Sequence, residues 1–221
     1  MIPLRDVIPS RTTPYITVTI ILLNAVAWFY EVSLPERSLN HFLFVYGLIP
    51  SAFNPATLIT SMFLHGSWLH VISNMWSLWI FGDNVEDRVG HGRFIVFYLL
   101  CGIAAGLGQI SLTPDLLVPT VGASGAIAGV MGAYIVLYPR SRVLTLIPWI
   151  FIQIVELPAI VVLGFWFLMQ LVNAGAIAAT MGSRGGGGVA FGAHVAGFVA
   201  GAAAIFLFKR RDQDYWDTAY Q

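Results

Sequence analysis

The chain has 221 residues, of which 57% are hydrophobic and 10% charged, and its mean hydropathy is +0.78. This composition excludes an ordinary soluble domain and predicts a polytopic membrane protein embedded in a lipid bilayer. A net charge of zero gives no case for nucleic acid, the single Cys101 excludes an internal disulfide, and five dispersed histidines predict neither a metal nor a cofactor site.

Six apolar segments are expected to cross the bilayer, since about 20 residues suffice for one helical span. Their boundaries are 15–31, 58–82, 94–112, 122–139, 159–181 and 189–208. We therefore expect an all-α fold, a single domain over residues 1–221 built as a bundle of six transmembrane helices. The first segment contains Ala25-Val26-Ala27, which is similar to a signal-peptide cleavage site, but its hydrophobicity continues to Tyr30 and favours a span.

The connectors between these segments hold most of the prolines and charges. Residues 1–14 form a short polar lead, and residues 31–54 predict an interfacial loop with short helices. The second span should end at a charged turn, GDNVEDRVGHGR. Residues 143–158 are apolar but contain two prolines and Glu156, which again predicts an interfacial loop. The glycine-rich residues 182–188 suggest a mobile cover before the sixth span.

Basic residues decide the expected orientation, because they concentrate in cytoplasmic loops. With a cytoplasmic N-terminus, nine lie inside and two, Arg37 and Arg184, lie outside. The nine are Arg5, Arg11, Arg88, Arg93, Arg140, Arg142, Lys209, Arg210 and Arg211. We expect both termini in the cytoplasm and the protein in a prokaryotic cell membrane.

Polar side chains are costly inside a membrane, so those within the expected spans are candidate functional residues. They are Asn24, His65, His70, Asn74, Gln109, Ser124, Gln170, Asn173 and His194. Counting about 1.5 Å per residue from the cytoplasmic ends places Ser124, His194 and His70 about 20 to 24 Å up, on three different spans. In a hydrocarbon core about 30 Å thick, this common height lies several ångströms below the outer boundary.

Ser124 and His194 both lie among small residues, which let neighbouring helices approach closely. Taken singly, a serine bonded to its own helix and a histidine that only ties helices together are the commoner cases. At matched depth, the two suit a nucleophile and its base, because serine needs a base near neutral pH. The small residues are Gly122 and Gly125 beside Ser124, and Gly197 and Gly201 on the face of His194.

His70 and Asn74 are four residues apart and share a helix face, so they could donate hydrogen bonds to one oxyanion. A structural pair that ties helices together accounts for them about equally well. No Asp or Glu is expected within a span, and Glu156 belongs to the opposite leaflet. We therefore predict a Ser-His dyad, with His194 oriented by helix packing and weak contacts rather than by an acid.

These motifs, in this order, resemble the rhomboid family of intramembrane serine proteases over nearly the whole six-span core. The resemblance implies that Ser124 is the nucleophile, His194 the base, and His70 with Asn74 the oxyanion donors. The matching motifs are Gly122-Ala123-Ser124-Gly125, Ala193-His194 with Gly197 and Gly201, the series His65, His70 and Asn74, and the turn of Glu86, Arg88 and Gly90. Two departures are Ala56 and Thr57 in place of a first-loop Trp-Arg pair, and Ala128 in place of a tyrosine that stacks on the histidine.

These residues bear on three alternative functions. An active protease that cuts single-span membrane proteins near the outer face explains the polar residues together. A catalytically silent rhomboid-like binding or quality-control protein shares the fold but usually lacks the serine or histidine. A channel or transporter is disfavoured, because no internal repeat or intramembrane carboxylate is seen. For a protease, we expect substrates with an external N-terminus, helix-destabilising residues in the outer part of the span and a small residue at the cut.

Overall fold

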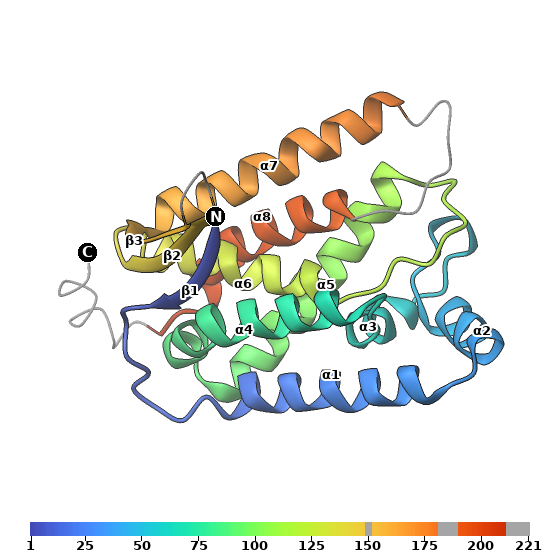
Figure 1. The fold of residues 1–221 in the computed structure, drawn as a ribbon, viewed down its shortest axis with the longest axis horizontal. Helices are drawn as coiled ribbons and strands as arrows, with labels where there is room; N and C mark the ends of the chain where they lie inside the picture. The colour runs from blue at the N-terminus through green and yellow to red at the C-terminus, as the bar shows by residue number, and fades with distance from the viewer. Residues whose placement is uncertain (149–151, 181–189, 211–221) are drawn as a thin grey trace.

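The computed structural model describes residues 1–148, 152–180 and 190–210. The fold is a polytopic helical bundle with one small sheet (Figure 1). In chain order the elements are β1 (Ile2–Asp6), α1 (Tyr15–Ser33), α2 (Glu36–Tyr46), η1 (Pro50–Ala52), α3 (Thr57–Thr60), η2 (Ser61–Phe63), α4 (Trp68–Val89), α5 (His91–Leu112), α6 (Ser124–Leu137), β2 (Arg142–Pro148), β3 (Ile152–Pro158), α7 (Ala159–Thr180) and α8 (Phe191–Phe208).

Helix α6 occupies the centre of the bundle and packs against α4, α5, α7 and α8, while α1 lies outside against α4 (Figure 1). The helix is buried from Gly125 to Tyr134. Its closest neighbour is α8, and a Cβ atom on Gly201 would collide with the backbone of Gly129. Glycine therefore sets the close approach of these two helices, as small residues do inside membranes.

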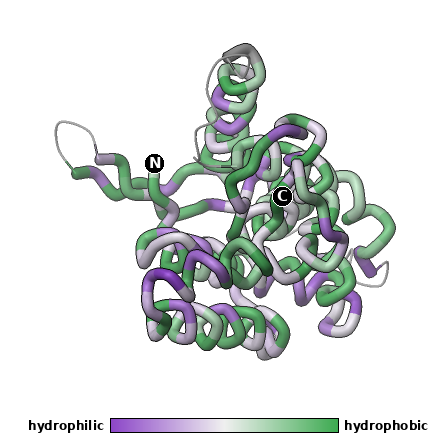
Figure 2. The backbone as a smooth tube through the Cα atoms, turned by 90° about the vertical axis from the view of Figure 1, so that its right-hand side faces the viewer, coloured by the Kyte–Doolittle hydropathy of each residue, from purple (hydrophilic) through white to green (hydrophobic). Residues whose placement is uncertain are grey.

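Four helices of the described chain are long and apolar enough to cross a membrane. They are α1, α5, α8 and residues Ala159–Ala178 of α7. Helix α6 has 14 residues and is shorter, and α4 has 22 residues but ends in a charged sequence. Hydrophobic residues recur along the helices (Figure 2), and many of them are exposed on the surface, among them Leu22, Val26 and Leu207. The chain is a multi-pass membrane protein, because such faces suit lipid rather than water.

The loop expected over residues 143–158 is instead a pair of strands, and the polar lead contributes a third. The sheet is antiparallel in the order β1-β2-β3, with Ile2 opposite Leu146 and Val143 opposite Leu157. The prolines that argued against regular structure stand at strand ends, where a missing N–H does no harm. We call the end of the bundle that carries this sheet the sheet end, and the opposite end the α2 end (Figure 1).

The second apolar segment also differs from its expected boundaries. Helix α4 begins at Trp68, because Ser67 caps it by accepting a hydrogen bond from the backbone of His70 at 3.1 Å. It then continues through the expected charged turn to Val89 and ends at Gly90, whose φ is 86°. The carboxylates of this last stretch are bound to the N-terminal segment, so they do not end the helix. The backbone N–H groups of Arg11 and Thr12 both donate to Asp87.

Glu86 caps helix α1 from another part of the chain. Helix α1 follows Pro14 and has no side-chain cap of its own. Instead, the backbone N–H groups of Ile16 and Thr17 donate to the two carboxylate oxygens of Glu86 at 3.0 and 2.8 Å. His91 contacts the same carboxylate. A buried acid at the positive end of a helix dipole thereby joins α1 to α4.

Asp6 joins the sheet to two helices. Its carboxylate accepts hydrogen bonds from Asn84 of α4 and Tyr134 of α6, both at 2.8 Å. Burial raises the pKa of Asp6 to about 7, and the nearby Asp83 adds to this effect against the opposing Tyr134 hydrogen bond. The N-terminal strand is thus attached through its backbone to β2 and through one side chain to the core.

Candidate active site

Ser124 stands at the first position of α6, facing the α2 end of the bundle. The chain reaches it through Gly122, whose φ of 129° is unfavourable for any residue with a side chain. The backbone N–H of Gly122 donates to Ser61 at 2.9 Å and fixes this turn. The serine hydroxyl is therefore held at a helix start next to a rigid, side-chain-free turn.

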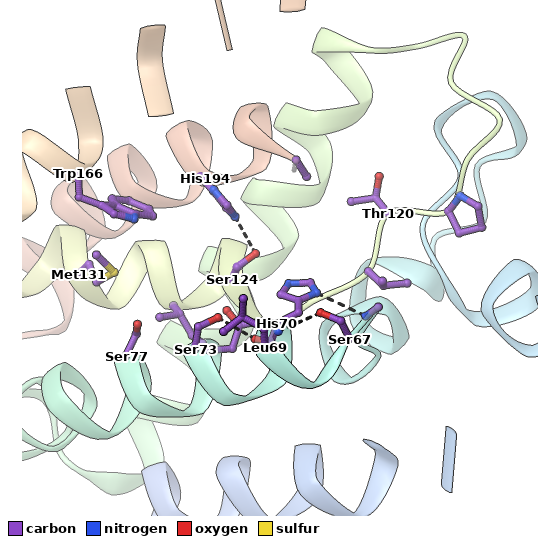
Figure 3. Close-up of a pocket in the computed structure, with 16 residues that line it drawn as sticks. Ser67, Leu69, His70, Ser73, Ser77, Thr120, Ser124, Met131, Trp166 and His194 are labelled. Carbon is purple, nitrogen blue, oxygen red and sulfur yellow. Dashed lines mark hydrogen bonds between the residues drawn. The ribbon is translucent and has the colours of Figure 1, made fainter. Parts of the chain in front are cut away.

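His194 meets Ser124 directly. Its Nε2 lies 2.7 Å from Ser124 Oγ, although 70 residues separate them (Figure 3). The imidazole is 8% exposed and belongs to the first turn of α8. Gly197 and Gly201 lie one and two turns further along α8 and face the backbone of α6. The structure thus brings together the two side chains that the sequence had placed at one depth.

Gln170 of α7 is the second partner of His194. Sequence reasoning gave Gln170 as a polar residue within a span but missed this contact. Its Oε1 lies 2.8 Å from His194 Nδ1, and both side chains are buried. An amide oxygen only accepts, so this contact places a proton on Nδ1 and leaves Nε2 free to accept from Ser124. His194 is oriented by a hydrogen bond to a neutral group, where only packing and weak contacts were expected.

The His70 ring faces the turn before Ser124 (Figure 3). A Cβ atom on Gly122 would lie 2.8 Å from His70 Nε2 and 3.6 Å from Ser124 Oγ. The other ring nitrogen, Nδ1, accepts a hydrogen bond from the backbone of Gly66 at 3.4 Å. This acceptor role puts the ring proton on Nε2, which can therefore donate beside Ser124.

Asn74 lies one turn further along α4 and lines the same cavity. Its Nδ2 is 3.0 Å from Nε2 of His65, which is itself buried in the turn before α4. The rings of His65 and His70 meet edge to face, with centroids 5.0 Å apart. His65, His70 and Asn74 therefore form one connected group beside Ser124.

Ser124, His194, His70 and Asn74 line a cavity of 670 Å³. It extends from the loops at the α2 end, past Ser124, to Met131 of α6 and Ser77 of α4 (Figure 3). Its lining mixes polar side chains, such as Ser73 and Ser77, with apolar ones, such as Ile127 and Met131, and this mixture suits a peptide segment. Across the described ranges, no group of three or more His, Cys, Asp or Glu side chains could hold a metal ion.

Two further residues discussed from the sequence, Glu156 and Ala128, lie away from the reacting atoms or within the core. Glu156 is exposed on β3 at the sheet end, where it pairs with Arg142 at 3.3 Å. Ala128 is buried within α6, and the rings beside His194 are Trp166 of α7, with its centroid 5.7 Å from the imidazole, and Phe191 of α8, at 6.4 Å. The expected glycine-rich cover, residues 182–188, lies outside the described residues.

Comparison with known sequences decides the family. The family model described as the rhomboid domain matches residues 52–211, most of the chain. The chain belongs to the rhomboid family. The region matched contains every residue of the group described above, and the resemblance seen in the sequence is thereby confirmed.

Relatives of this rhomboid include plant and bacterial proteins. Rhomboid-like protein 11, chloroplastic, of Arabidopsis thaliana is 26% identical over 85% of this chain and 66% of its own length. Rhomboid protease GluP of Bacillus subtilis is 36% identical over 57% of this chain and 24% of its own. RHOMBOID-like protein 6, mitochondrial, of Arabidopsis thaliana is 29% identical over 72% and 46%. The chain thus spans from about a quarter to about two thirds of the length of these relatives.

Proposed function

We propose that this rhomboid is an intramembrane serine endopeptidase that cuts membrane-spanning proteins. The observation that carries the proposal is the contact of 2.7 Å between Ser124 Oγ and His194 Nε2, with His194 Nδ1 held by Gln170. A serine, a base in the required tautomer and a residue that orients the base are what nucleophilic attack needs. A relative named as a rhomboid protease, GluP, supports proteolysis as the activity.

In the proposed reaction, Ser124 Oγ attacks the scissile carbonyl carbon while its proton moves to His194 Nε2. His194 then gives this proton to the leaving amine, and an acyl-enzyme remains on Ser124. Water, deprotonated by the same imidazole, attacks the ester and releases the new carboxylate. His70 Nε2 and the second amide hydrogen of Asn74 are the proposed donors to the oxyanion in both steps.

The proposed substrate is a single transmembrane helix that unwinds before it is cut. A helical carbonyl is tied to the amide four residues on, so attack by Ser124 requires local unwinding. With a volume of 670 Å³ and several serine and histidine side chains in its lining, the cavity offers room for part of an extended segment and for water. With both termini in the cytoplasm, as the distribution of basic residues favours, the cut lies in the outer part of the bilayer.

Labelling with a fluorophosphonate and cleavage of a single-span substrate test the proposal together. Wild type should be labelled and should cleave, whereas Ser124→Ala and His194→Ala should do neither while keeping their thermal unfolding midpoint. Ser111→Ala is the matched control, because this exposed serine only bonds to its own helix at Leu107. A folded but inert wild type would favour the silent rhomboid-like protein, and full activity of Ser124→Ala would refute the proposal.

A further inference from the structure

Glu31 is a buried carboxylate that takes no part in the reaction proposed above. It lies in the last turn of α1, is fully buried, and belongs to a helix that does not line the active-site cavity. The sequence had placed no acid within a span. Burial of a carboxyl group is costly unless hydrogen bonds offset it, so this position calls for a partner.

The partner is the turn that precedes α4. The backbone N–H of His65 lies 3.2 and 3.3 Å from the two carboxylate oxygens of Glu31. The turn over residues 64–67 connects η2 to α4; the backbone N–H of Leu64 still bonds to Ser61 of η2, whereas that of His65 points to Glu31. Glu31 therefore fixes the turn by its backbone from a neighbouring helix.

This same turn controls both proposed oxyanion donors. The side chain of His65 contacts the Asn74 amide at 3.0 Å and so fixes the amide plane. The next residue, Gly66, donates its backbone N–H to His70 Nδ1 and so keeps the ring proton on Nε2. A shift of the turn would change both the orientation of the Asn74 amide and the tautomer of His70.

We infer that Glu31 is a positioning residue for the oxyanion hole, acting through the backbone of the turn over residues 64–67. This inference rests on the proposed function. The carboxylate needs only to accept a hydrogen bond, because its partner is a neutral backbone N–H. It should matter for the transition state, where the oxyanion forms, and little for substrate binding.

Kinetics on a set of Glu31 variants test the inference. Glu31→Gln keeps an acceptor oxygen and should retain kcat within about threefold. Glu31→Met keeps the length but lacks the oxygen, and its kcat should fall about 10-fold to 100-fold, less than the 10²- to 10³-fold typical when one donor is lost outright. KM should be unchanged in both. Glu36→Ala, which removes an exposed acid just after α1, is the control and should equal wild type.

Nitrogen-15 NMR of histidine-labelled protein gives a readout that does not depend on activity. In wild type and Glu31→Gln, the His70 resonances should show a protonated Nε2 and an unprotonated Nδ1, whereas Glu31→Met should show a mixture of tautomers. Should the Met variant fail to fold, Glu31→Asp replaces it, because the shorter side chain withdraws the acceptor. Unchanged kcat and tautomer in the folded Met or Asp variant would overturn the inference.

The two proposals fail separately. If wild type neither cleaves nor reacts with a fluorophosphonate, the proposed function is lost, and the His70 tautomer still decides whether Glu31 positions the turn. If wild type cleaves and Glu31→Gln falls as far as Glu31→Met, the acceptor argument is wrong while the protease remains.

Discussion

At the scale of single residues, the base and its orientation depend on groups from three helices. Ser124 comes from α6, His194 from α8 and Gln170 from α7. The contact with Gln170 sets the imidazole tautomer but supplies no full charge to stabilise an imidazolium, unlike the carboxylate of a triad. The proposed catalysis therefore depends on geometry and on the oxyanion donors more than on an acid.

Replacing Gln170 by leucine should lower kcat about 10-fold to 100-fold, as removal of a group that orients a reacting histidine commonly does. KM should change little, because Gln170 does not line the cavity that would receive substrate. Cleavage of a single-span substrate over a range of concentrations measures both constants. Asn173→Ala is the control, since Asn173 lies on the same helix and only donates to its own Met169. An unchanged kcat for Gln170→Leu would show that packing alone orients His194.

The pairing of Ser124 with His194 could be predicted from the sequence, whereas the contact between Gln170 and His194 could not. Both outcomes have the same cause. Counting residues along straight helices gives depth, and the same count from Ala159 places Gln170 about 17 Å up, within a side chain's reach of His194. The count gives no helix rotation, so it could not say which of several polar residues faces the imidazole. Glu31 was missed because it is the last residue of the expected first span and was counted with the connector 31–54, whereas α1 continues to Ser33.

At the scale of elements, charges that the sequence assigned to a turn are structural parts of two helices. Glu86 stands in α4 and caps α1, which explains why a helix can begin after a proline without a capping side chain. The strands were missed because β2 finds its partners on both sides, one of them at the far end of the chain. A local pattern of prolines and charges carries no information about such a partner.

Glu86→Ala should destabilise the folded protein by about 1–3 kcal/mol, because it leaves a buried and a part-buried N–H group at the start of α1 without an acceptor. The midpoint of thermal unfolding in detergent should fall by several degrees. Glu156→Ala is the comparison, since its exposed pair with Arg142 contributes little. Equal midpoints for the two variants would contradict the capping role.

The stability of the folded protein should depend on pH through Asp6, at the sheet end. The folded-state pKa is about 7, above the ordinary value of 3.8. Below pH 4 the group is protonated in both states; as pH rises from 4 to 7, the unfolded state loses the proton first, and stability falls. Thermal midpoints measured from pH 4 to pH 8 should therefore decline more for wild type than for Asp6→Asn. Parallel profiles would show that Asp6 does not titrate in this range.

At the scale of the whole molecule, the active site lies at one end of the bundle and the sheet at the other (Figure 1). The cavity runs along α4 and α6 toward the sheet end but stops at Ser77 and Met131. In the proposed reaction, a substrate helix must break its own hydrogen bonds to enter this space. Helix stability in the substrate should therefore control the rate.

Replacing the helix-destabilising residues of a cleaved substrate by leucine, with the cut-site residues kept, should slow cleavage. Each glycine replaced strengthens a helix by about 1 kcal/mol and each proline by about 3, which together can lower kcat/KM about 10-fold or more. Rates measured in liposomes for the original and the stiffened span provide the comparison. Equal rates would refute local unwinding as a requirement.

The pairing of β1 with β2 also has a consequence for biosynthesis. Ile2 lies opposite Leu146, so the strand near the N-terminus finds its partner only after α1, α4, α5 and α6 have been made. Until then, its backbone N–H and C=O groups are open to pairing with any other extended chain. Closing such a distant contact is slow, and it comes late by necessity. A ribosome that stalls after α6 would leave a bundle that still lacks α7 and α8, with an unpaired strand at its sheet end.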